Sequence, residues 1–375
     1  MKVFKQSPLL DLFGLQYPLI QAPMAGANDA RMVIEVSDAG AMGSLPCAML
    51  DVAGARTQLE QIRSATNRPF NVNFFCHEEQ PVTAEQEALW RGELAPYYRE
   101  AGLDAEQPLK VASRKPFSAA MCELMEEFTP TVISFHFGLP EKALMHRLKV
   151  AGCKIISSAT TVEEAVWLEA QGCDAVIAQG VEAGGHRGMF LKSDISTQTG
   201  SMSLLPQVVD AVSVPVIATG GFADARGIKA AFTLGAAAVQ LGTAYLFTRE
   251  SLISDMHRRA LLESGSDQTA LTNLFSGRPA RGLMTRVMQE IGPISASTPP
   301  FPTAGAALAP LKSHYEKQGK TDFTSLWAGQ GYALTREALM ADTGMPVSQG
   351  STDELYNVSA AEMTKWLADA VVSAT

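Results

Sequence analysis

The residue with the clearest chemical potential is His186, within the glycine-rich residues 179–188. Gly184, Gly185 and Gly188 flank it, giving the histidine freedom to reach a ligand but little packing support. A histidine placed between glycines gains little stability from packing, so we expect its imidazole to have a function. An imidazole hydrogen-bonds anions and accepts a proton near neutrality, because its unperturbed pKa is about 6.5. We therefore predict a mobile loop that carries a functional histidine over a bound ring.

Two further segments are suited to binding phosphate. Gly220 and Gly221 follow one apolar run, and Gly242 and Thr243 end the next. Without a Cβ, the backbone N–H groups can approach phosphate oxygens, and the threonine hydroxyl adds a donor. Either pair alone is compatible with a tight turn or a strand bend, but both on adjacent strands favour a phosphate site. A dinucleotide fingerprint at 180–185 is a weaker interpretation, because no acidic residue follows in a clear strand context.

A second histidine, His136, lies between Phe135 and Phe137 at the end of another apolar run, where it is either functional or a core imidazole bonded to backbone. No HExxH motif or cluster with ligand spacing is present, so we expect no catalytic metal. No nucleophile elbow or base-activated thiol supports covalent hydrolase chemistry. The remaining histidines fall in expected helices or polar insertions and are predicted to lie at the surface: His77, His146, His257 and His314.

The fold must bring these candidate residues together in space. Short apolar, β-rich runs alternate with longer segments of helical period, which is typical of βαβ units and a parallel sheet. Eight units favour a TIM (β/α)8 barrel over a doubly wound open sheet, and in a barrel the C-terminal strand ends form the active-site face. The candidate residues fall at such ends. The runs are 18–24, 41–46, 70–76, 131–137, 154–160, 174–180, 215–221 and 237–243.

Two regions do not fit this repeat. Residues 1–250 are predicted to hold the barrel, but 77–115 form a polar helical insertion within them. Residues 251–355 contain helices broken by Gly/Pro stretches, and we expect a smaller, mainly helical second domain that caps one barrel face. Residues 356–375 contain an amphipathic helix that is predicted to pack back on the barrel. Its apolar face comprises Met363, Trp366, Leu367, Ala370 and Val371.

Composition narrows the functional class. Of the 375 residues, 46% are hydrophobic and 18% are charged, with a net charge of −9. This composition supports a large core and excludes a disordered chain, and the lack of a basic stripe argues against a nucleic-acid partner. Polar residues interrupt the most apolar window, 230–247, so we expect no membrane span. Five scattered cysteines without a CxxC pair, and no signal peptide, predict a cytoplasmic protein.

Six ordered motifs resemble those of the nitronate monooxygenases, formerly called 2-nitropropane dioxygenases. The segments FSGRPARGL (275–283) and SLWAGQGY (325–332) match as well, so the resemblance covers nearly the whole chain. The combination is specific, although no single motif is. The six are QAPMAG (21–26), FNVNFF (70–75), SFHFG (134–138), AQGVEAGGHRG (178–188), ATGGFAD (218–224) and QLGTAYL (240–246).

The resemblance implies an FMN-dependent enzyme of the first class in this family, which oxidises alkyl nitronates such as propionate 3-nitronate with O2. The products would be a carbonyl compound and nitrite. His186 would be the catalytic residue, and His136 would bind the substrate. The residues that would contact FMN are Ala22, Pro23, Met24, Asn73, Gln179, Gly184, Gly185, Gly220, Gly221, Gln240, Leu241, Gly242 and Thr243.

Related flavoproteins remain as alternatives. Flavin-dependent enoyl-ACP reductases share a GGH-type loop and the phosphate motifs, and NADH:quinone reductases share the barrel. The SFHFG motif and the HRG ending at 186–188 favour the nitronate enzyme. A non-catalytic flavin carrier or sensor is the third alternative, against which the histidine-bearing loop and the lack of a signalling domain argue. The physiological nitronate, and whether the protein is a monomer or a homodimer, stay open.

Overall fold

The computed structural model of the protein describes residues 7–109, 114–343 and 356–373. Its central sheet has eight parallel strands: β1 (Leu19–Gln21), β2 (Gly43–Pro46), β3 (Phe70–Phe75), β4 (Val132–His136), β5 (Lys154–Ala159), β6 (Ala175–Gln179), β8 (Val216–Thr219) and β9 (Ala238–Leu241). Their order is β1-β9-β8-β6-β5-β4-β3-β2. The two edges meet where Met42 N donates to Leu19 O at 3.0 Å and Gln21 N donates to Met42 O at 2.9 Å. The predicted TIM barrel is confirmed.

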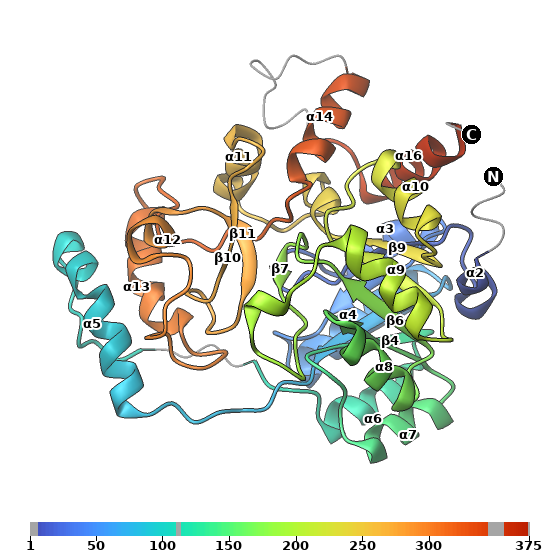
Figure 1. Cartoon of the computed structure of the whole chain (residues 1–375), viewed down its shortest axis with the longest axis horizontal. Coiled ribbons are helices and arrows are strands. Elements are labelled where there is room, and N and C mark those ends of the chain that lie inside the picture. The colour runs from blue at the N-terminus through green and yellow to red at the C-terminus, as the bar shows by residue number, and fades with distance from the viewer. Residues whose placement is uncertain (1–6, 110–113, 344–355, 374–375) are drawn as a thin grey trace.

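Helices surround this barrel (Figure 1). Six of them begin at an N-cap residue whose side chain accepts a backbone N–H, which satisfies a donor that the helix itself leaves free. These caps are Asp29, Asp51, Ser118, Thr161, Asp224 and Ser359. The helices around the barrel are α3 (Ala30–Asp38), α4 (Val52–Ala65), α6 (Ala119–Phe128), α7 (Lys142–Val150), α8 (Val162–Ala170), α9 (Ser201–Ala211), α10 (Ala225–Thr233) and α16 (Ala360–Ser373).

A short helix that the sequence pattern did not predict, α2 (Pro8–Phe13), contributes to the interior of the barrel. Its Leu9 and Phe13 are buried in one cluster with Ile20, Val132 and Ile217, from the barrel strands. Strand residues alternate between this interior cluster and the larger cluster between strands and outer helices, as the two-residue period of a strand requires. The strands are therefore buried on both sides.

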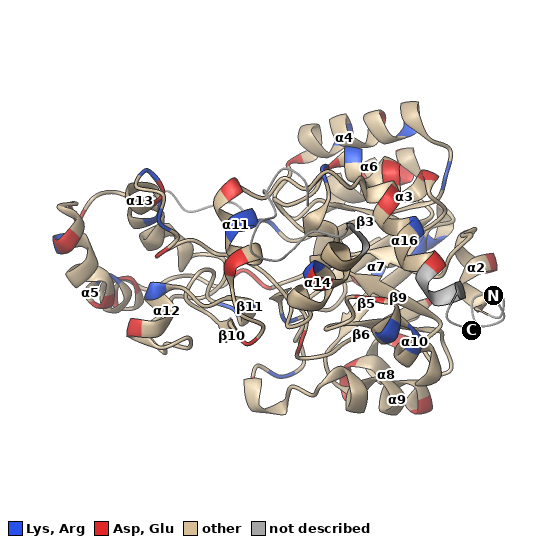
Figure 2. Ribbon diagram, turned by 90° about the horizontal axis from the view of Figure 1, so that it is seen from above, with Lys and Arg blue, Asp and Glu red and all other residues tan. Residues whose placement is uncertain are grey.

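A second hydrophobic core combines two distant parts of the chain. Helix α5 (Ala84–Ala101), from the polar insertion, buries Trp90 and Tyr98 against residues of α13 (Gly305–Glu316). Trp90 Nε1 donates to Ala304 O at 2.9 Å, and Tyr98 OH donates to Ala307 O at 2.7 Å. Figure 2 shows the two helices together at the end of the molecule farthest from α2. The insertion and the block after residue 250 thus share one core.

The insertion and the block after residue 250 together form a second unit of the molecule. This second unit also contains strands, which the sequence pattern did not predict. Strand β10 (Thr269–Thr272) pairs with β11 (Ala280–Leu283), and β11 pairs with β7 (Gly185–His186). The three-stranded sheet therefore ties the second unit to the loop after β6. The remaining described elements are α11 (Asp255–Glu263), α12 (Arg286–Ile291), α14 (Tyr332–Thr343) and the 3-10 helices η1 (Ile195–Thr197) and η2 (Thr243–Phe247).

The C-terminal helix α16 packs on α3 and α10. Its Met363 and Leu367 are fully buried, and Thr364 Oγ1 lies 2.9 Å from Tyr245 OH. The side chains of Ala370 and Val371, and residues 344–355 of the expected second domain, lie outside the described residues. Within the described ranges, no helix is long and apolar enough to cross a membrane.

Candidate active site

A cavity of about 570 Å³ opens at the C-terminal ends of the barrel strands. Leu241 does not line it. Its side chain is 1% exposed in the core, because successive strand residues face opposite sides and its neighbour Gln240 faces the cavity. The cofactor contact predicted for Leu241 could therefore come only from its backbone. The other predicted residues all line the cavity: Ala22, Pro23, Met24, Asn73, His136, Gln179, Gly184, Gly185, His186, Gly220, Gly221, Gln240, Gly242 and Thr243.

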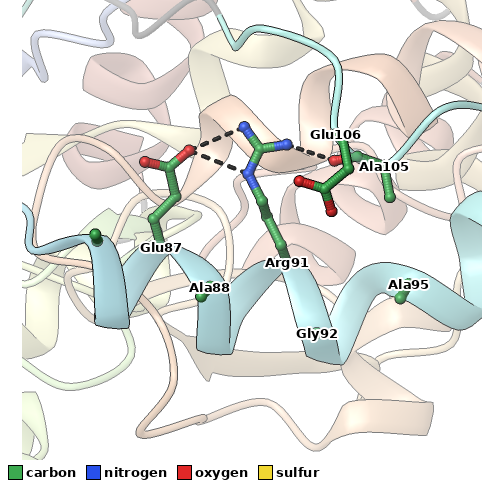
Figure 3. A pocket seen from close by; sticks show the side chains of 8 residues that line it. Glu87, Ala88, Arg91, Gly92, Ala95, Ala105 and Glu106 are labelled. Carbon is green, nitrogen blue, oxygen red and sulfur yellow. Dashed lines mark hydrogen bonds and ion pairs between the residues drawn. The ribbon is translucent and has the colours of Figure 1, made fainter.

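A second cavity, of about 410 Å³, lies along α5 and contains none of these residues (Figure 3). The cation that lines it, Arg91, pairs with Glu87 at 2.9 Å and donates to Ala105 O. Small side chains form much of the remaining wall, including those of Ala88 and Ala95. Because the cation that lines it is already paired and its lining contains no histidine, we place the chemistry in the barrel cavity.

His186 lies on a strand and not on a mobile loop. In β7, Gly185 pairs with Arg281 and His186 pairs with Ala280 of β11. The imidazole Nε2 lies 2.8 Å from Ser276 Oγ. The loop is therefore anchored by backbone pairing to the second unit, which the glycine content of residues 179–188 did not reveal. The mobile-loop prediction is wrong.

Aromatic rings surround the His186 imidazole. Its centroid lies 5.4 Å from that of Phe301, 5.7 Å from Trp327 and 6.1 Å from Phe137. The apolar faces of these rings exclude water, and the two phenylalanine rings offer no hydrogen-bond partner to the imidazole nitrogens. A fixed imidazole in an apolar surrounding is the arrangement expected of a group that acts on a ligand in the cavity.

Two side chains fix the peptide of His186. Gln179 Nε2 donates to His186 O at 3.0 Å, while Gln179 Oε1 accepts from Gly188 N at 2.8 Å. His136 Nε2 lies 3.1 Å from the same carbonyl, and its Nδ1 lies 3.1 Å from Ser158 Oγ. Because a carbonyl only accepts, His136 carries its proton on Nε2. Gln179 and His136 therefore each use one side-chain nitrogen to hold the carbonyl of His186, and both also line the cavity.

Arg187 is a buried positioning residue that the sequence pattern did not identify. It is 1% exposed and donates to Gly180 O at 2.6 Å, Gln179 O at 2.6 Å and Gln198 Oε1 at 2.8 Å. Burial lowers the pKa of Arg187 to about 9. Arg187 follows His186 directly and holds it to the end of β6. The arginine of the HRG motif therefore positions the histidine that precedes it.

The buried carboxylate of Glu164 anchors the next part of this loop. It accepts from Thr160 N at 2.7 Å, from Phe190 N at 2.7 Å and from Leu191 N at 3.2 Å. Gln198 Nε2 donates to Thr160 Oγ1 at 3.0 Å, which links this group to Arg187 through neutral side chains. Buried polar groups of the loop after β6 are thus satisfied within it, which stabilises its conformation.

Both histidines of the site are neutral at physiological pH. Burial lowers the pKa of His136 to about 4. Burial, followed by the positive charge of Arg114, holds the pKa of His186 well below its ordinary value, and Arg278 adds to the effect. A neutral imidazole is free to accept a proton. The surrounding positive charge favours an anionic ligand.

The glycines of the expected phosphate site are needed for backbone geometry. Gly220 and Gly221 have φ of 110° and 79°, which disfavour L side chains. A Cβ at Gly220 would lie 2.9 Å from Gly180 O, and one at Gly184 would lie 2.5 Å from Gly329 N. Loops from β6, β8 and the second unit thus approach one another closely, and only glycine permits this.

The remaining polar groups fit a bound cofactor. Gln240 lines the cavity, and its buried Oε1 has no hydrogen-bond partner among the described residues. Thr243 Oγ1 accepts from Gly329 N at 3.0 Å and keeps its proton for another acceptor. A buried acceptor and a free hydroxyl beside glycine turns suit a ligand with amide and phosphate groups. No group of His, Cys, Asp or Glu in the described ranges is arranged to hold a metal ion.

Two histidines predicted at the surface are buried. His77 is 3% exposed, with its ring 4.8 Å from Phe301. His257 is 7% exposed and lines the cavity. The predictions failed because they treated the polar insertion and the cap helices as solvated, whereas tertiary packing covers them. His146 is exposed, as predicted.

We expect the protein to lose stability as the pH falls from about 6.5 to 4. The pKa of His77 is lowered to about 4 by burial, and so is that of His257. In this window the unfolded chain binds protons that the folded protein excludes. The free energy of unfolding therefore falls by roughly 1 kcal/mol per pH unit for each histidine. Thermal midpoints of wild type and His77→Phe at pH 7.5, 6 and 5 would measure this. The variant should show a shallower decline, whereas His146→Gln should match wild type. Equal slopes for wild type and His77→Phe would contradict the assignment.

Comparison with known proteins shows the family of this chain. The family model described as nitronate monooxygenase matches residues 6–342. A nitronate monooxygenase of Pseudomonas aeruginosa is 39% identical over 338 residues, covering 88% of this chain and 95% of that protein. A probable nitronate monooxygenase of Staphylococcus aureus is 35% identical over 334 residues, covering 88% and 93%.

Solved structures show the same relationship. A nitroalkane oxidase from Streptomyces ansochromogenes superimposes with a TM-score of 0.82 at 34% identity, covering 98% of both chains. FabK from Thermotoga maritima shares the fold, with a TM-score of 0.69 at 22% identity over 98% of this chain and 97% of that one. A flavin cofactor is consistent with these relatives. The motif resemblance is confirmed: the chain belongs to the nitronate monooxygenase family and is an oxidoreductase.

Proposed function

We propose that this protein is an FMN-dependent nitronate monooxygenase. It converts alkyl nitronates, such as propionate 3-nitronate, with O2 into a carbonyl compound and nitrite. The observation that carries the proposal is the neutral imidazole of His186, held near Ser276 and facing a cavity lined by the motifs that would contact a flavin. We further propose a cytoplasmic location and a monomer or homodimer. The five free cysteines are in keeping with a reducing compartment.

The cofactor would be held by backbone and side-chain groups at the strand ends. Gly220, Gly221, Gly242 and Thr243 would bind its phosphate, and Gln240 Oε1 would accept a hydrogen bond from it. Residues 22–24, which line the cavity, would lie along the ring. FMN, when bound, supplies electron transfer between the nitronate and O2.

The protein residues supply orientation and proton handling. His186 would hydrogen-bond the nitronate oxygens, over which the negative charge is spread. With a neutral nitroalkane, the same imidazole would take the α-proton, which its low pKa leaves it free to do. Gln179, His136 and Arg187 would hold this imidazole at a constant position. The aromatic rings around it would exclude bulk water from the reacting atoms.

The test is turnover with a nitronate. Purified protein loaded with FMN should release nitrite from an alkyl nitronate in the presence of O2. Under anaerobic conditions the nitronate should bleach the flavin absorbance, and NADH should not. Bleaching by NADH alone would instead support a reductase of the enoyl-ACP or quinone type. Absence of both responses from a flavin-loaded, folded sample would support a non-catalytic flavin protein.

We expect the protein to purify with non-covalent FMN and not FAD, because the cavity combines one phosphate cradle with no adenylate-binding unit. Chromatography of flavin released by denaturation identifies it. Gly221→Val should reduce FMN retention, since φ is 79° and a Cβ would press on Glu182 at 3.0 Å. Gly152→Val, at a positive φ with open space where its Cβ would stand and away from the cavity lining, controls for backbone strain alone. Recovery of FAD would contradict the expectation.

A further inference from the structure

One residue of the FSGRPARGL segment (275–283), Ser276, contacts the imidazole of His186. Ser276 Oγ lies 2.8 Å from His186 Nε2. The serine is 2% exposed and lies outside the lining of the barrel cavity, whereas His186 belongs to that lining. The Nε2 edge of the imidazole is therefore turned away from the cavity, toward a neutral hydroxyl of the second unit.

The direction of this hydrogen bond follows from the other bonds of the serine hydroxyl. A hydroxyl donates one hydrogen bond and accepts two. Ser276 Oγ lies 3.2 Å from Arg278 O, which only accepts, and Arg278 N donates to the same Oγ at 3.4 Å. If the serine proton went to His186, Arg278 O would receive no hydrogen bond from the described residues. Ser276 Oγ therefore accepts its hydrogen bond from His186 Nε2–H.

The second ring nitrogen, Nδ1, is the one that remains for a ligand. It makes no hydrogen bond with the residues that the structure describes, yet it retains exposed surface. A neutral imidazole with its proton on Nε2 carries a lone pair on Nδ1. The lone pair of His186 is thus on the nitrogen that a molecule in the cavity can reach.

The backbone holds the serine at this position. Gly277, the next residue, has φ of 89°, and a Cβ there would clash with Pro299 O. Arg187 N donates to Pro279 O at 2.9 Å, which ties the same turn to the residue that follows His186. The backbone thus fixes both partners of the bond between hydroxyl and imidazole.

We propose that Ser276 is a positioning residue that keeps the proton of neutral His186 on Nε2, so that Nδ1 is the atom that takes the α-proton of a nitroalkane. This inference rests on the proposed function. In the step, the Cα–H bond of the nitroalkane breaks and its proton forms an N–H bond at Nδ1. The electron pair of the broken bond becomes the C=N bond of the nitronate, and the negative charge moves to the nitro oxygens. The new Nδ1–H then donates to those oxygens, so one imidazole performs both roles.

The positive charge that forms on the imidazole makes the serine important for the rate. A hydrogen bond to a charged group is about twice as strong as one between neutral groups, so the bond from Nε2–H to Ser276 strengthens as the proton arrives. Ser276→Ala removes this bond and allows the tautomer with its proton on Nδ1, which cannot accept a proton from the cavity. It should lower kcat/KM for nitroethane by about 10- to 100-fold. For the preformed nitronate of nitroethane the change should be less than about 3-fold, because no C–H bond breaks.

A spectroscopic measurement separates this inference from the proposed function. In protein labelled with nitrogen-15 histidine, the shifts of the ring nitrogens and their couplings to the ring protons show which nitrogen carries the proton. The signals of His186 are those absent from His186→Asn, and in wild type they should show the proton on Nε2. Ser276→Ala should show a mixture of both tautomers. Ser276→Thr, which keeps the hydroxyl, should restore the wild-type spectrum and most of kcat/KM. If the spectra are as expected while no nitronate is oxidised, Ser276 still sets the tautomer and the proposed function fails.

Three results would overturn the role of Ser276. The first is a wild-type spectrum with the proton of His186 on Nδ1. The second is an equal loss of kcat/KM on nitroethane and its nitronate in Ser276→Ala, which would indicate a general disturbance of the site. The third is a wild-type tautomer and wild-type kcat/KM in that variant. Ser295→Ala is the matched control, because it removes another buried hydroxyl of the second unit, one that donates to Glu93 at 2.9 Å outside the cavity lining. It should leave the His186 signals and both rates unchanged.

Discussion

Replacing His186 with Asn is expected to lower kcat/KM for neutral nitroalkanes by about 10²- to 10⁴-fold, the usual contribution of a positioned general base. Asparagine keeps a polar group near Ser276, but its side-chain amide is too weak a base to accept the α-proton. Flavin content should stay at the wild-type level, because the peptide of residue 186, and not its ring, is bound by Gln179 and His136. Initial rates of nitrite release, with released flavin quantified in parallel, measure both effects.

Preformed nitronates separate the two roles of His186. They need no deprotonation, so His186→Asn should lose less activity on them than on the parent nitroalkanes. The pH profile gives an independent check. Because the pKa of His186 lies well below 6.5, wild-type activity on nitroalkanes should stay level as the pH falls through 6.5 and decline only under more acidic conditions. Wild-type turnover of nitroalkanes by the variant would contradict the assignment of His186 as the base.

Arg187→Met is expected to produce the second large effect. It leaves Gln179 O, Gly180 O and Gln198 Oε1 without their donor in a buried place, which costs about 1–3 kcal/mol for each acceptor. The thermal midpoint should fall by several degrees. Because this donor set fixes the strand end that carries His186, kcat for nitronates should fall more than KM rises. Thermal unfolding and steady-state kinetics on the same sample measure the two consequences.

The matched variant is Arg187→Lys. Its ammonium keeps the charge but cannot reach three acceptors in the fork geometry of a guanidinium, so it should restore part of the stability and part of kcat. Gln198→Leu removes one of the three acceptors together with the link to Thr160, and should fall between wild type and Arg187→Met. A variant at position 187 that has a lower thermal midpoint than wild type but an unchanged kcat would show that Arg187 supports the fold without positioning His186.

The sequence predicted the barrel well because parallel strands carry a local signal. Each strand is a short apolar run, and each following helix has its own period, so eight units are countable without tertiary information. The candidate site followed from the rule that loops at the C-terminal strand ends bind ligands. His136 and His186 were located in this way, and both line the cavity. The motif resemblance then pointed to the family.

The failures have a common physical cause: they depend on contacts between distant segments. Strand β7 has two residues and exists only because β11, about 95 residues later, pairs with it, so residues 179–188 read as a flexible loop. His77 is buried because Phe301 packs on it from the second unit.

The shared core of α5 and α13 has a consequence for synthesis on the ribosome. Trp90 bonds to Ala304 across 214 residues of sequence. At roughly 5–20 residues per second, the apolar face of α5 leaves the ribosome on the order of 10 to 40 seconds before its packing partners exist. During that interval Trp90, Leu94 and Tyr97 are exposed beside a barrel that is still being completed. The nascent chain is therefore expected to depend on chaperone capture at α5, and pulse-labelled chains released before residue 304 should be the ones that aggregate.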